Sequence, residues 1–229
     1  MDKIYSQIAI PGDQPHFKRL AETLESIKIA NISVMEGLIG LSPLVSDADW
    51  LSLVVGLKLP TNKEIENPII SVIENDDLIY ERFGTRDFNW SEAKINNIMD
   101  NLITIQVYTA WNPPIPFMIL LTQLYKLNAV IFFDGQGFDF PGKATFNSNG
   151  LVSCEILSHS DLFEKFPDKY PHQFMFDVEV AKNMGKSWAD FHNNIKDYYT
   201  ETDIALCQQF WNNNDSLFDS PSDLNININ

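Results

Sequence analysis

Side chains that could hold a metal ion or carry out acid–base chemistry are scattered along this chain of 229 residues. The four histidines show no His-x3-His spacing, and the two cysteines form no Cys-x2-Cys pair, so a zinc site is not indicated. The histidines are His16, His159, His172 and His192. Carboxylates could bind a divalent cation at Asp76 with Asp77, or at Asp134 with Asp139. Such acids are more often solvated loop residues, so the sequence predicts no metal and no other cofactor.

Motifs for a catalytic nucleophile or a bound phosphate are also missing from the sequence. It has no Gly-x-Ser-x-Gly elbow, and Gly135-Gln136-Gly137 lacks the third glycine and the Lys-Ser/Thr ending of a phosphate loop. Residues 135–140 do resemble the aromatic strand on which RNA-recognition domains stack bases. Those domains place Lys or Arg before the strand, whereas Asp134 and Asp139 flank it here. Negative charge opposes a phosphate backbone, so the sequence predicts neither catalytic residues nor a nucleic-acid partner.

Charge is the strongest signal in the composition. The chain has 31 acidic and 16 basic residues and a formal net charge of −15. The segment 197–229 carries Asp and Glu but neither Lys nor Arg. Such a surface attracts basic partners and repels phosphates. The plain interpretation is solubility. The more specific one is a protein that offers carboxylates to a basic groove, as a mimic of DNA would.

Membrane insertion and an oxidising compartment are not indicated by the sequence. The longest unbroken apolar run, Phe117 to Leu121, is far shorter than the about 20 residues that span a bilayer. The start, Met1 to Gln7, has no apolar block like that of a signal peptide. Cys154 and Cys207 are expected to stay reduced. We therefore expect a cytoplasmic protein without a membrane partner.

The elements that would position any site follow from hydrophobic spacing. Alternation over 4–10 predicts a strand, and helical spacing over 17–27 predicts the helix after it. Further strands are expected at 78–83, 103–108 and 129–133, with a closing hairpin at 143–156. Helices are expected from Asn89 or Ser91 to Leu102, and from Pro113, capped by Asn112, to Leu127.

Strands separated by helices and ending in a meander predict an α+β fold. The economical solution is a ferredoxin-like sandwich with a mainly antiparallel sheet over residues 1–157, with an insertion at about 29–77. Residues 158–211 are expected to form a helical extension, with Ser160 and Ser187 as caps. One helix face is expected to carry Trp188, Phe191, Ile195 and Tyr198, and a second helix is marked by Ile204, Cys207 and Phe210. Residues 212–229 are rich in Asn, Asp and Ser, and are expected to form a disordered tail.

Three strings resemble a known family. The run from Ile79 to Arg86, with Phe83-Gly84-Thr85-Arg86, resembles the aromatic-Gly-Thr-Lys signature of the YubB-like ferredoxin-like proteins of phages and plasmids. Thr109 to Pro116 is similar to that family's Thr-Ala-Trp-Ser-Pro-Pro string, and Gly135 to Phe146 to its closing hairpin. The resemblance implies a ferredoxin-like fold and a mobile-element origin. It carries over no activity and no catalytic residues.

The leading hypothesis is a non-enzymatic phage or mobile-element protein, in the cytosol of a bacterial host, that binds a host or phage protein through its acidic surface. Its most specific form is inhibition of a bacterial defence nuclease by DNA mimicry. Two alternatives remain open: a small-ligand binder or enzyme with a pocket near Arg86, Asp87 and Trp111, and a structural or assembly protein. The binding surface is expected to involve Arg86, Asp87, Trp111, Asp134 and Asp139.

Overall fold

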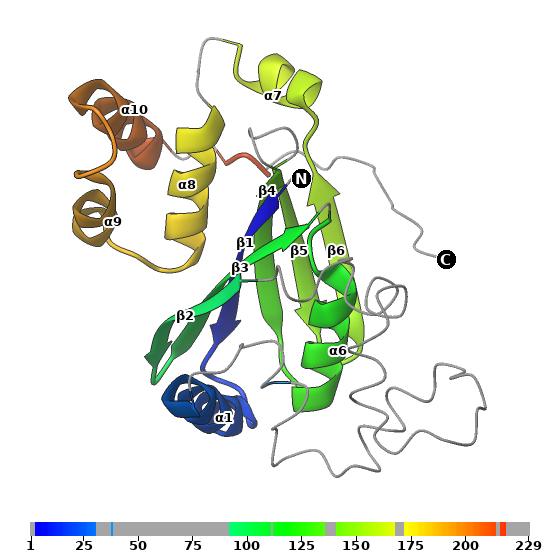
Figure 1. Ribbon diagram of the computed structural model, residues 1–229. Helices are drawn as coiled ribbons and strands as arrows, with labels where there is room; N and C mark the ends of the chain where they lie inside the picture. Colours follow the sequence, from blue (N-terminus) through cyan, green and yellow to red (C-terminus); the bar gives the residue numbers. More distant parts are fainter. Residues whose placement is uncertain are drawn as a thin grey trace. The chain divides into compact units, whose positions relative to one another are not determined.

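The computed structural model describes residues 3–30, 38, 92–110, 112–135, 141–167, 172–213 and 216–218. The elements of the sheet region are β1 (Lys3–Pro11), α1 (Phe17–Ala30), β2 (Glu92–Met99), β3 (Leu102–Ala110), α6 (Ile115–Tyr125), β4 (Ala129–Gly135), β5 (Gly142–Asn147) and β6 (Gly150–Ile156). They are followed by α7 (His159–Lys165), α8 (His172–Asn183), α9 (Trp188–Ile195) and α10 (Glu201–Asn212), as drawn in Figure 1.

The chain divides into two compact units, which are described separately. The first, here called the sheet unit, comprises Met1–Phe133 and Ala144–Ser153. The second, here called the helical unit, comprises Asp134–Lys143 and Cys154–Asn229.

The sheet has six strands in the order β2-β3-β1-β4-β5-β6. Strand β1 pairs antiparallel with β3, and β3 pairs antiparallel with β2. The first four strands with α1 and α6 reproduce the β-α-β-β-α-β topology of the ferredoxin-like fold, and the β5–β6 hairpin extends the sheet on the β4 side. The predicted α+β ferredoxin-like sandwich with a mainly antiparallel sheet and a helical extension is confirmed.

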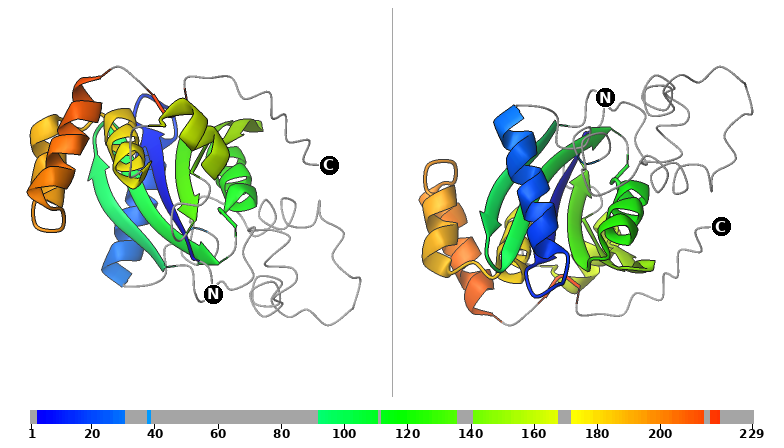
Figure 2. Two further views of the ribbon diagram at one scale, coloured as in Figure 1. Left: turned by 90° about the horizontal axis from the view of Figure 1, so that it is seen from above. Right: turned by 90° about the horizontal axis from the view of Figure 1, so that it is seen from below.

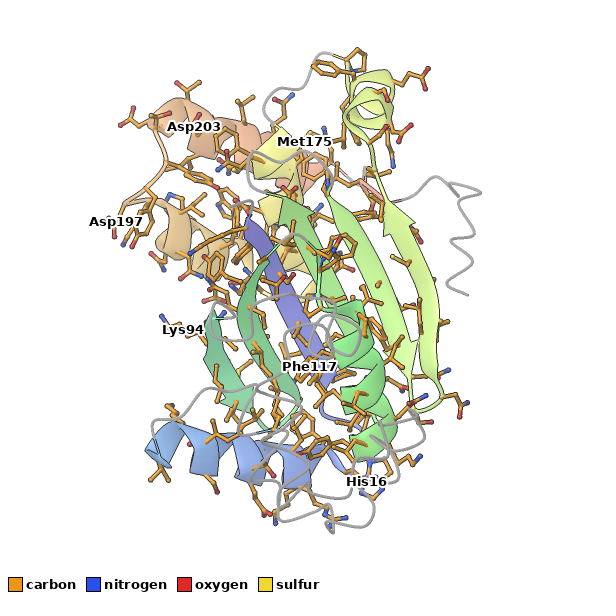
Figure 3. The ribbon with its side chains drawn as sticks, turned by 45° about the vertical axis from the view of Figure 1, so that its right-hand side comes forward. His16, Lys94, Phe117, Met175, Asp197 and Asp203 are labelled. Carbon is orange, nitrogen blue, oxygen red and sulfur yellow. The ribbon has the colours of Figure 1, made fainter. Side chains whose placement is uncertain are left out.

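One face of the sheet forms the core of the sheet unit. Ile4, Ser6, Ile8 and Ile10 of β1 are buried and pair in register with Thr109, Val107, Ile105 and Ile103 of β3. Helices α1 and α6 lie over the same side of the strands in the right-hand view of Figure 2. Phe117 of α6 is buried and is labelled in Figure 3. The alternation read from the sequence therefore places apolar side chains where the two helices can cover them.

The helix predicted over 91–102 is wrong, because β2 and the start of β3 occupy these residues. The β2–β3 register shifts between Ile95 and Asn97, so one extra residue bulges from β2. The bulge lets Ile95 pair with Ile105 and Ile98 pair with Ile103. A spacing of three between same-face isoleucines is normal for a helix, and the bulge produces it in a strand.

The next helix starts later than predicted. Its N-cap is Pro114, without a side-chain hydrogen bond, so neither the Asn112 cap nor Pro113 as first helical residue is correct. The Asn112 carbonyl instead accepts a hydrogen bond of 2.7 Å from Thr109 Oγ1 at the end of β3. The helix ends at Tyr125, and its C-cap residue Lys126 takes the left-handed conformation at φ 53°.

Gly12 lies where the end of β1 meets the β2–β3 turn, and its N–H donates to the Asn101 carbonyl at 2.8 Å. A Cβ at this position would lie 2.3 Å from Asn101 Cα, and backbone cannot move aside as a side-chain tip can. We expect Gly12→Ala to lower the free energy of unfolding by about 2 kcal/mol. Gly185→Ala is the control: its φ is +67° but no atom lies within 4 Å of the added Cβ, so only about 1 kcal/mol of strain is expected. Equal losses of unfolding free energy in the two variants, measured by urea denaturation, would contradict the close approach at Gly12.

Three helices of the helical unit begin with the same device. Ser158, Ser187 and Thr200 each accept a hydrogen bond from the backbone N–H three residues later, and an Asp at that third position bonds back to the cap. The predicted Ser187 cap is confirmed, whereas the first of these helices is capped by Ser158 and not by Ser160. The acids involved are Asp161, Asp190 and Asp203. Part of the negative charge in this segment therefore stabilises helix N-termini.

Helices α8, α9 and α10 pack together around aromatic side chains. The rings of Phe191 on α9 and Trp211 on α10 stack with centroids 5.5 Å apart, and Trp188 lies 5.5 Å from Trp211. Cys207 and Phe210 are buried, as the helical spacing predicts. Tyr198 does not join the buried face expected for it, because α9 ends at Ile195 and the tyrosine is 85% exposed.

Residues 216–218, here called the carboxyl-terminal strap, are fixed against the helical unit. Ser216 Oγ donates to Glu179 Oε1 at 2.7 Å, and Lys165 Nζ donates to the Leu217 carbonyl at 2.8 Å. The side chain of Leu217 is fully buried. The strap lies within the segment predicted to be a disordered tail, and residues 219–229 lie outside the described residues. The predicted insertion, apart from residues 29, 30 and 38, and the strand at 78–83 also lie outside them.

Candidate functional site

Most of the predicted binding surface lies outside the described residues. This holds for Arg86, Asp87, Trp111 and Asp139, so their grouping stays a prediction. Asp134 is described: it is near the end of β4 and is 1% exposed. Within the described part of the chain, no group of three His, Cys, Asp or Glu side chains could hold a metal ion.

The sheet unit presents a paired arrangement of tyrosine and glutamine on the face opposite its core. Tyr5 on β1 is opposite Tyr108 on β3, and Gln7 is opposite Gln106. The tyrosine rings lie 5.3 Å apart between centroids at an angle of 50°. All four side chains are half-buried. We call them the Tyr–Gln face.

Each tyrosine of the Tyr–Gln face is fixed by the glutamine two residues away on its own strand. Gln106 Nε2 donates to Tyr108 Oη at 2.7 Å, and Gln7 Nε2 donates to Tyr5 Oη. Residues two apart on a strand share a face, so Tyr-x-Gln on β1 and Gln-x-Tyr on β3 meet because the strands run antiparallel. The result is two adjacent rings held by side-chain amides.

Lysines stand at the margins of the Tyr–Gln face. Lys3 is two residues before Tyr5 on β1, and Lys94 of β2 pairs with Gln106 in register. Both lysines are exposed, and Figure 3 labels Lys94 at the outer strand. The register also places Glu92 opposite Tyr108. The described charged positions beside the two rings are therefore two lysines and one glutamate.

The helical unit contains a half-buried acid, Asp177. Tyr199, in the α9–α10 connection, donates a hydrogen bond to Asp177 Oδ2 on α8, and its ring packs edge-on against Phe174 with centroids 4.7 Å apart. Burial raises the pKa of Asp177 to about 6, although the Tyr199 hydrogen bond and the charge of Lys186 act in the opposite direction.

Burial also shifts the pKa values of neighbouring groups. Burial raises the pKa of the Cys207 thiol to about 12, and the nearby charges of Asp177 and Asp203 add to the effect. Burial lowers the pKa of Lys186. A thiol with so high a pKa is a poor nucleophile. The cluster connects α8 to the α9–α10 connection, and the pKa of Asp177 lies closer to neutral pH than that of the Cys207 thiol.

Exposed charges differ in kind between the two units among the described residues. In the helical unit five acids and one base, Lys196, are exposed. The acids are Asp161, Glu164, Asp190, Asp197 and Glu201. In the sheet unit six bases and four acids are exposed. The bases are Lys3, Lys18, Arg19, Lys28, Lys94 and Lys126, and the acids are Asp13, Glu22, Glu25 and Asp100. Of the described surface, it is the helical unit that carries the excess of negative charge.

The connection between α9 and α10 brings two exposed acids and an exposed tyrosine together. Asp197 and Glu201 are exposed, and Tyr198 between them is 85% exposed. Figure 3 labels Asp197 at the outer end of this connection. Neither Asp197 nor Glu201 belongs to a capping box. We call Asp197, Tyr198 and Glu201 the α9–α10 corner.

Comparison with known proteins gives a match to one part of the chain. Residues 89–172 match a family model described as a ferredoxin-like domain in Api92-like protein. The matched range contains β2 to β6, α6 and α7. It therefore includes β3 with Tyr108 and Gln106, but neither β1 nor the α9–α10 corner.

Among solved structures, the chain is similar to the crystal structure of a protein api92 from Yersinia pseudotuberculosis. The identity is 10%, the TM-score is 0.38, and the match covers 69% of this chain and 98% of that one. No curated protein matches. In the described part of the chain, no helix has the length and hydropathy to cross a membrane.

Sequence reasoning missed both the Tyr–Gln face and the α9–α10 corner. The alternation on β1 and β3 was readable, but it does not give the register that sets Tyr5 against Tyr108. The corner was missed because Tyr198 continues a helical spacing from Trp188. The signal that α9 ends earlier is the Thr200-x-x-Asp203 capping box, which requires a new helix to begin there.

Proposed function

We propose that this protein is a binding protein whose helical unit docks on a basic surface of another protein. The observation that carries the proposal is the contrast in exposed charge among the described residues: five acids and one base in the helical unit, against four acids and six bases in the sheet unit. Opposite potentials steer two proteins together and fix their orientation.

The α9–α10 corner is the proposed contact. A tyrosine that is 85% exposed offers a rigid ring and a hydroxyl, which suits the centre of an interface. Asp197 and Glu201 beside it would pair with Lys or Arg of the partner. Asp190, also exposed, adds charge from the start of α9, although its role in the capping box ties it to stability as well.

The resemblance of the Phe83–Arg86 and Thr109–Pro116 strings to the YubB-like proteins suggests where such a partner is found. We propose a phage or mobile-element protein that acts in the cytosol of a bacterial host. In its most specific form the partner is a defence nuclease, and the carboxylates of the helical unit occupy the groove that binds DNA phosphates. The net charge of −15 supports this form, since competition with DNA requires many carboxylates.

The test is the affinity of variants for a partner recovered from bacterial lysate at low salt. We expect Tyr198→Ala to weaken binding by roughly tenfold or more, since a buried interface tyrosine contributes about 2 kcal/mol. The double variant Asp197→Asn/Glu201→Gln should weaken it by roughly tenfold and flatten its salt dependence. A double-stranded oligonucleotide should displace the partner if the DNA-mimic form is correct.

Matched controls lie in the sheet unit. Ile29 is 84% exposed, so Ile29→Ala removes an equally exposed apolar side chain, and Glu22→Gln/Glu25→Gln removes two exposed charges from α1. Both controls should bind like the parent chain. Recovery of no partner at low salt, or equal weakening by the controls, would refute the proposal.

A further inference from the structure

We propose that the Tyr–Gln face of the sheet unit binds the bases of single-stranded nucleic acid. This inference is independent of the protein contact proposed for the helical unit. It concerns different residues, Tyr5, Gln7, Gln106 and Tyr108, on the two central strands β1 and β3.

The two rings provide the stacking surface. They are adjacent, at 5.3 Å between centroids, and belong to directly paired residues. A tyrosine ring stacks on a base of any identity because every base has a π-face. Ferredoxin-like sheets that recognise RNA also stack bases on aromatic side chains of the sheet face that the helices leave uncovered. In this chain Tyr5 and Tyr108 lie on the face of β1 and β3 opposite the buried apolar residues of these strands.

The glutamines provide the groups that can recognise base edges. A glutamine amide has two N–H donors and one carbonyl acceptor. The bond to the tyrosine hydroxyl uses one donor of each amide. A second donor and the acceptor oxygen lie side by side on the same group, which is the pattern that complements an adenine edge. The same bond holds each amide beside the ring on which a base would stack.

The local charge is compatible with a phosphate backbone. Lys3 and Lys94 are exposed on strands that carry or adjoin the Tyr–Gln face, and Glu92 is the acid that the register places opposite Tyr108. Bases outnumber acids among the exposed described residues of the sheet unit. The formal charge of −15 belongs to the whole chain and does not describe this face. Two lysines attract a single strand weakly, so the expected binding is dominated by stacking and visible at low salt.

The test is fluorescence anisotropy of the full chain with labelled single-stranded oligonucleotides, one rich in adenine and one in uracil. We expect binding at low salt, weakened roughly tenfold by Tyr108→Ala or Tyr5→Ala. Tyr108→Phe keeps the ring and should bind within about threefold of the parent chain. Lys94→Gln, at an exposed site, should reduce the salt slope by about 0.7, as one lost phosphate contact predicts.

Tyr198→Ala is the matched control, because it removes an exposed tyrosine of the helical unit and should leave oligonucleotide binding unchanged. Absence of binding to both oligonucleotides, or equal affinity of Tyr108→Ala and the parent, would overturn the inference. If the alanine variants do not fold, an unchanged salt slope in Lys94→Gln would overturn it as well. Mononucleotides or duplex DNA bound as tightly as the single strands would exclude a single strand as the ligand. A failure here leaves the Tyr198-dependent protein contact untouched, and the reverse also holds.

Discussion

Replacing Leu217 with alanine should lower the free energy of unfolding of the helical unit by about 2–5 kcal/mol. The side chain is fully buried, although Leu217 is the last residue but one of the described part of the chain. Its segment is held by the bonds from Ser216 to Glu179 and from Lys165 to the Leu217 carbonyl. An alanine leaves a cavity that these polar contacts prevent from closing. Urea denaturation followed by tryptophan fluorescence measures the change, since Trp188 and Trp211 belong to this unit.

Leu206→Ala is the control for the carboxyl-terminal strap. Leu206 is on α10 in the same unit but is 37% exposed, so we expect a loss below about 1 kcal/mol. If Leu217→Ala costs no more than Leu206→Ala, the strap does not contribute to the fold of the helical unit in solution.

Asp177 should make the helical unit less stable as the pH rises from about 4 to 6. Its carboxyl has a pKa of 3.8 when unfolded and about 6 when folded, so the folded state binds the proton more tightly. The stabilisation by that proton is fully present below the unfolded pKa and is lost as the pH passes the folded one. The whole effect is about 3 kcal/mol, at 1.36 kcal/mol per pKa unit.

Asp177→Asn should remove this pH dependence, because the amide is neutral throughout and its oxygen can still accept the Tyr199 hydroxyl. Asp197→Asn, at an exposed acid, should leave it in place. The pKa values of Asp161 and Asp190 are lowered by bonds from their caps, so their contributions are lost only as the pH falls through and below 3.8. The measurement is the urea midpoint of the parent chain and both variants between pH 4 and 6. A stability of the parent chain that rises over this interval would contradict a raised pKa for Asp177.

Hydrophobic spacing predicted the helices and strands whose pattern is regular. It predicted the wrong element where one extra residue interrupts the alternation of a strand. The strand over 4–10 and the buried positions Cys207 and Phe210 follow from period alone. In β2 the bulge between Ile95 and Asn97 gives the isoleucines the spacing of a helix. The sequence therefore predicted a helix where the structure has a strand. A single-residue bulge has no reliable mark in a sequence, because it depends on the partner strand.

The candidate sites depended on pairings between distant parts of the chain. Tyr5 and Tyr108 are brought together by the β1–β3 register, and Asp177 and Tyr199 by the packing of α10 on α8. Neither pairing leaves a signal within one segment. The total negative charge could be read from composition, but its concentration among the described residues of the helical unit could not, since it requires knowing which acids are exposed.

The most direct test of the proposed function is hydrogen–deuterium exchange of the chain with and without the partner recovered from lysate. The α9–α10 corner is predicted to contact that partner, so amides from about Ser187 to Leu206 should exchange more slowly in the complex, while α1 exchanges as before. Protection confined to the sheet unit, with the α9–α10 corner unchanged, would contradict the account.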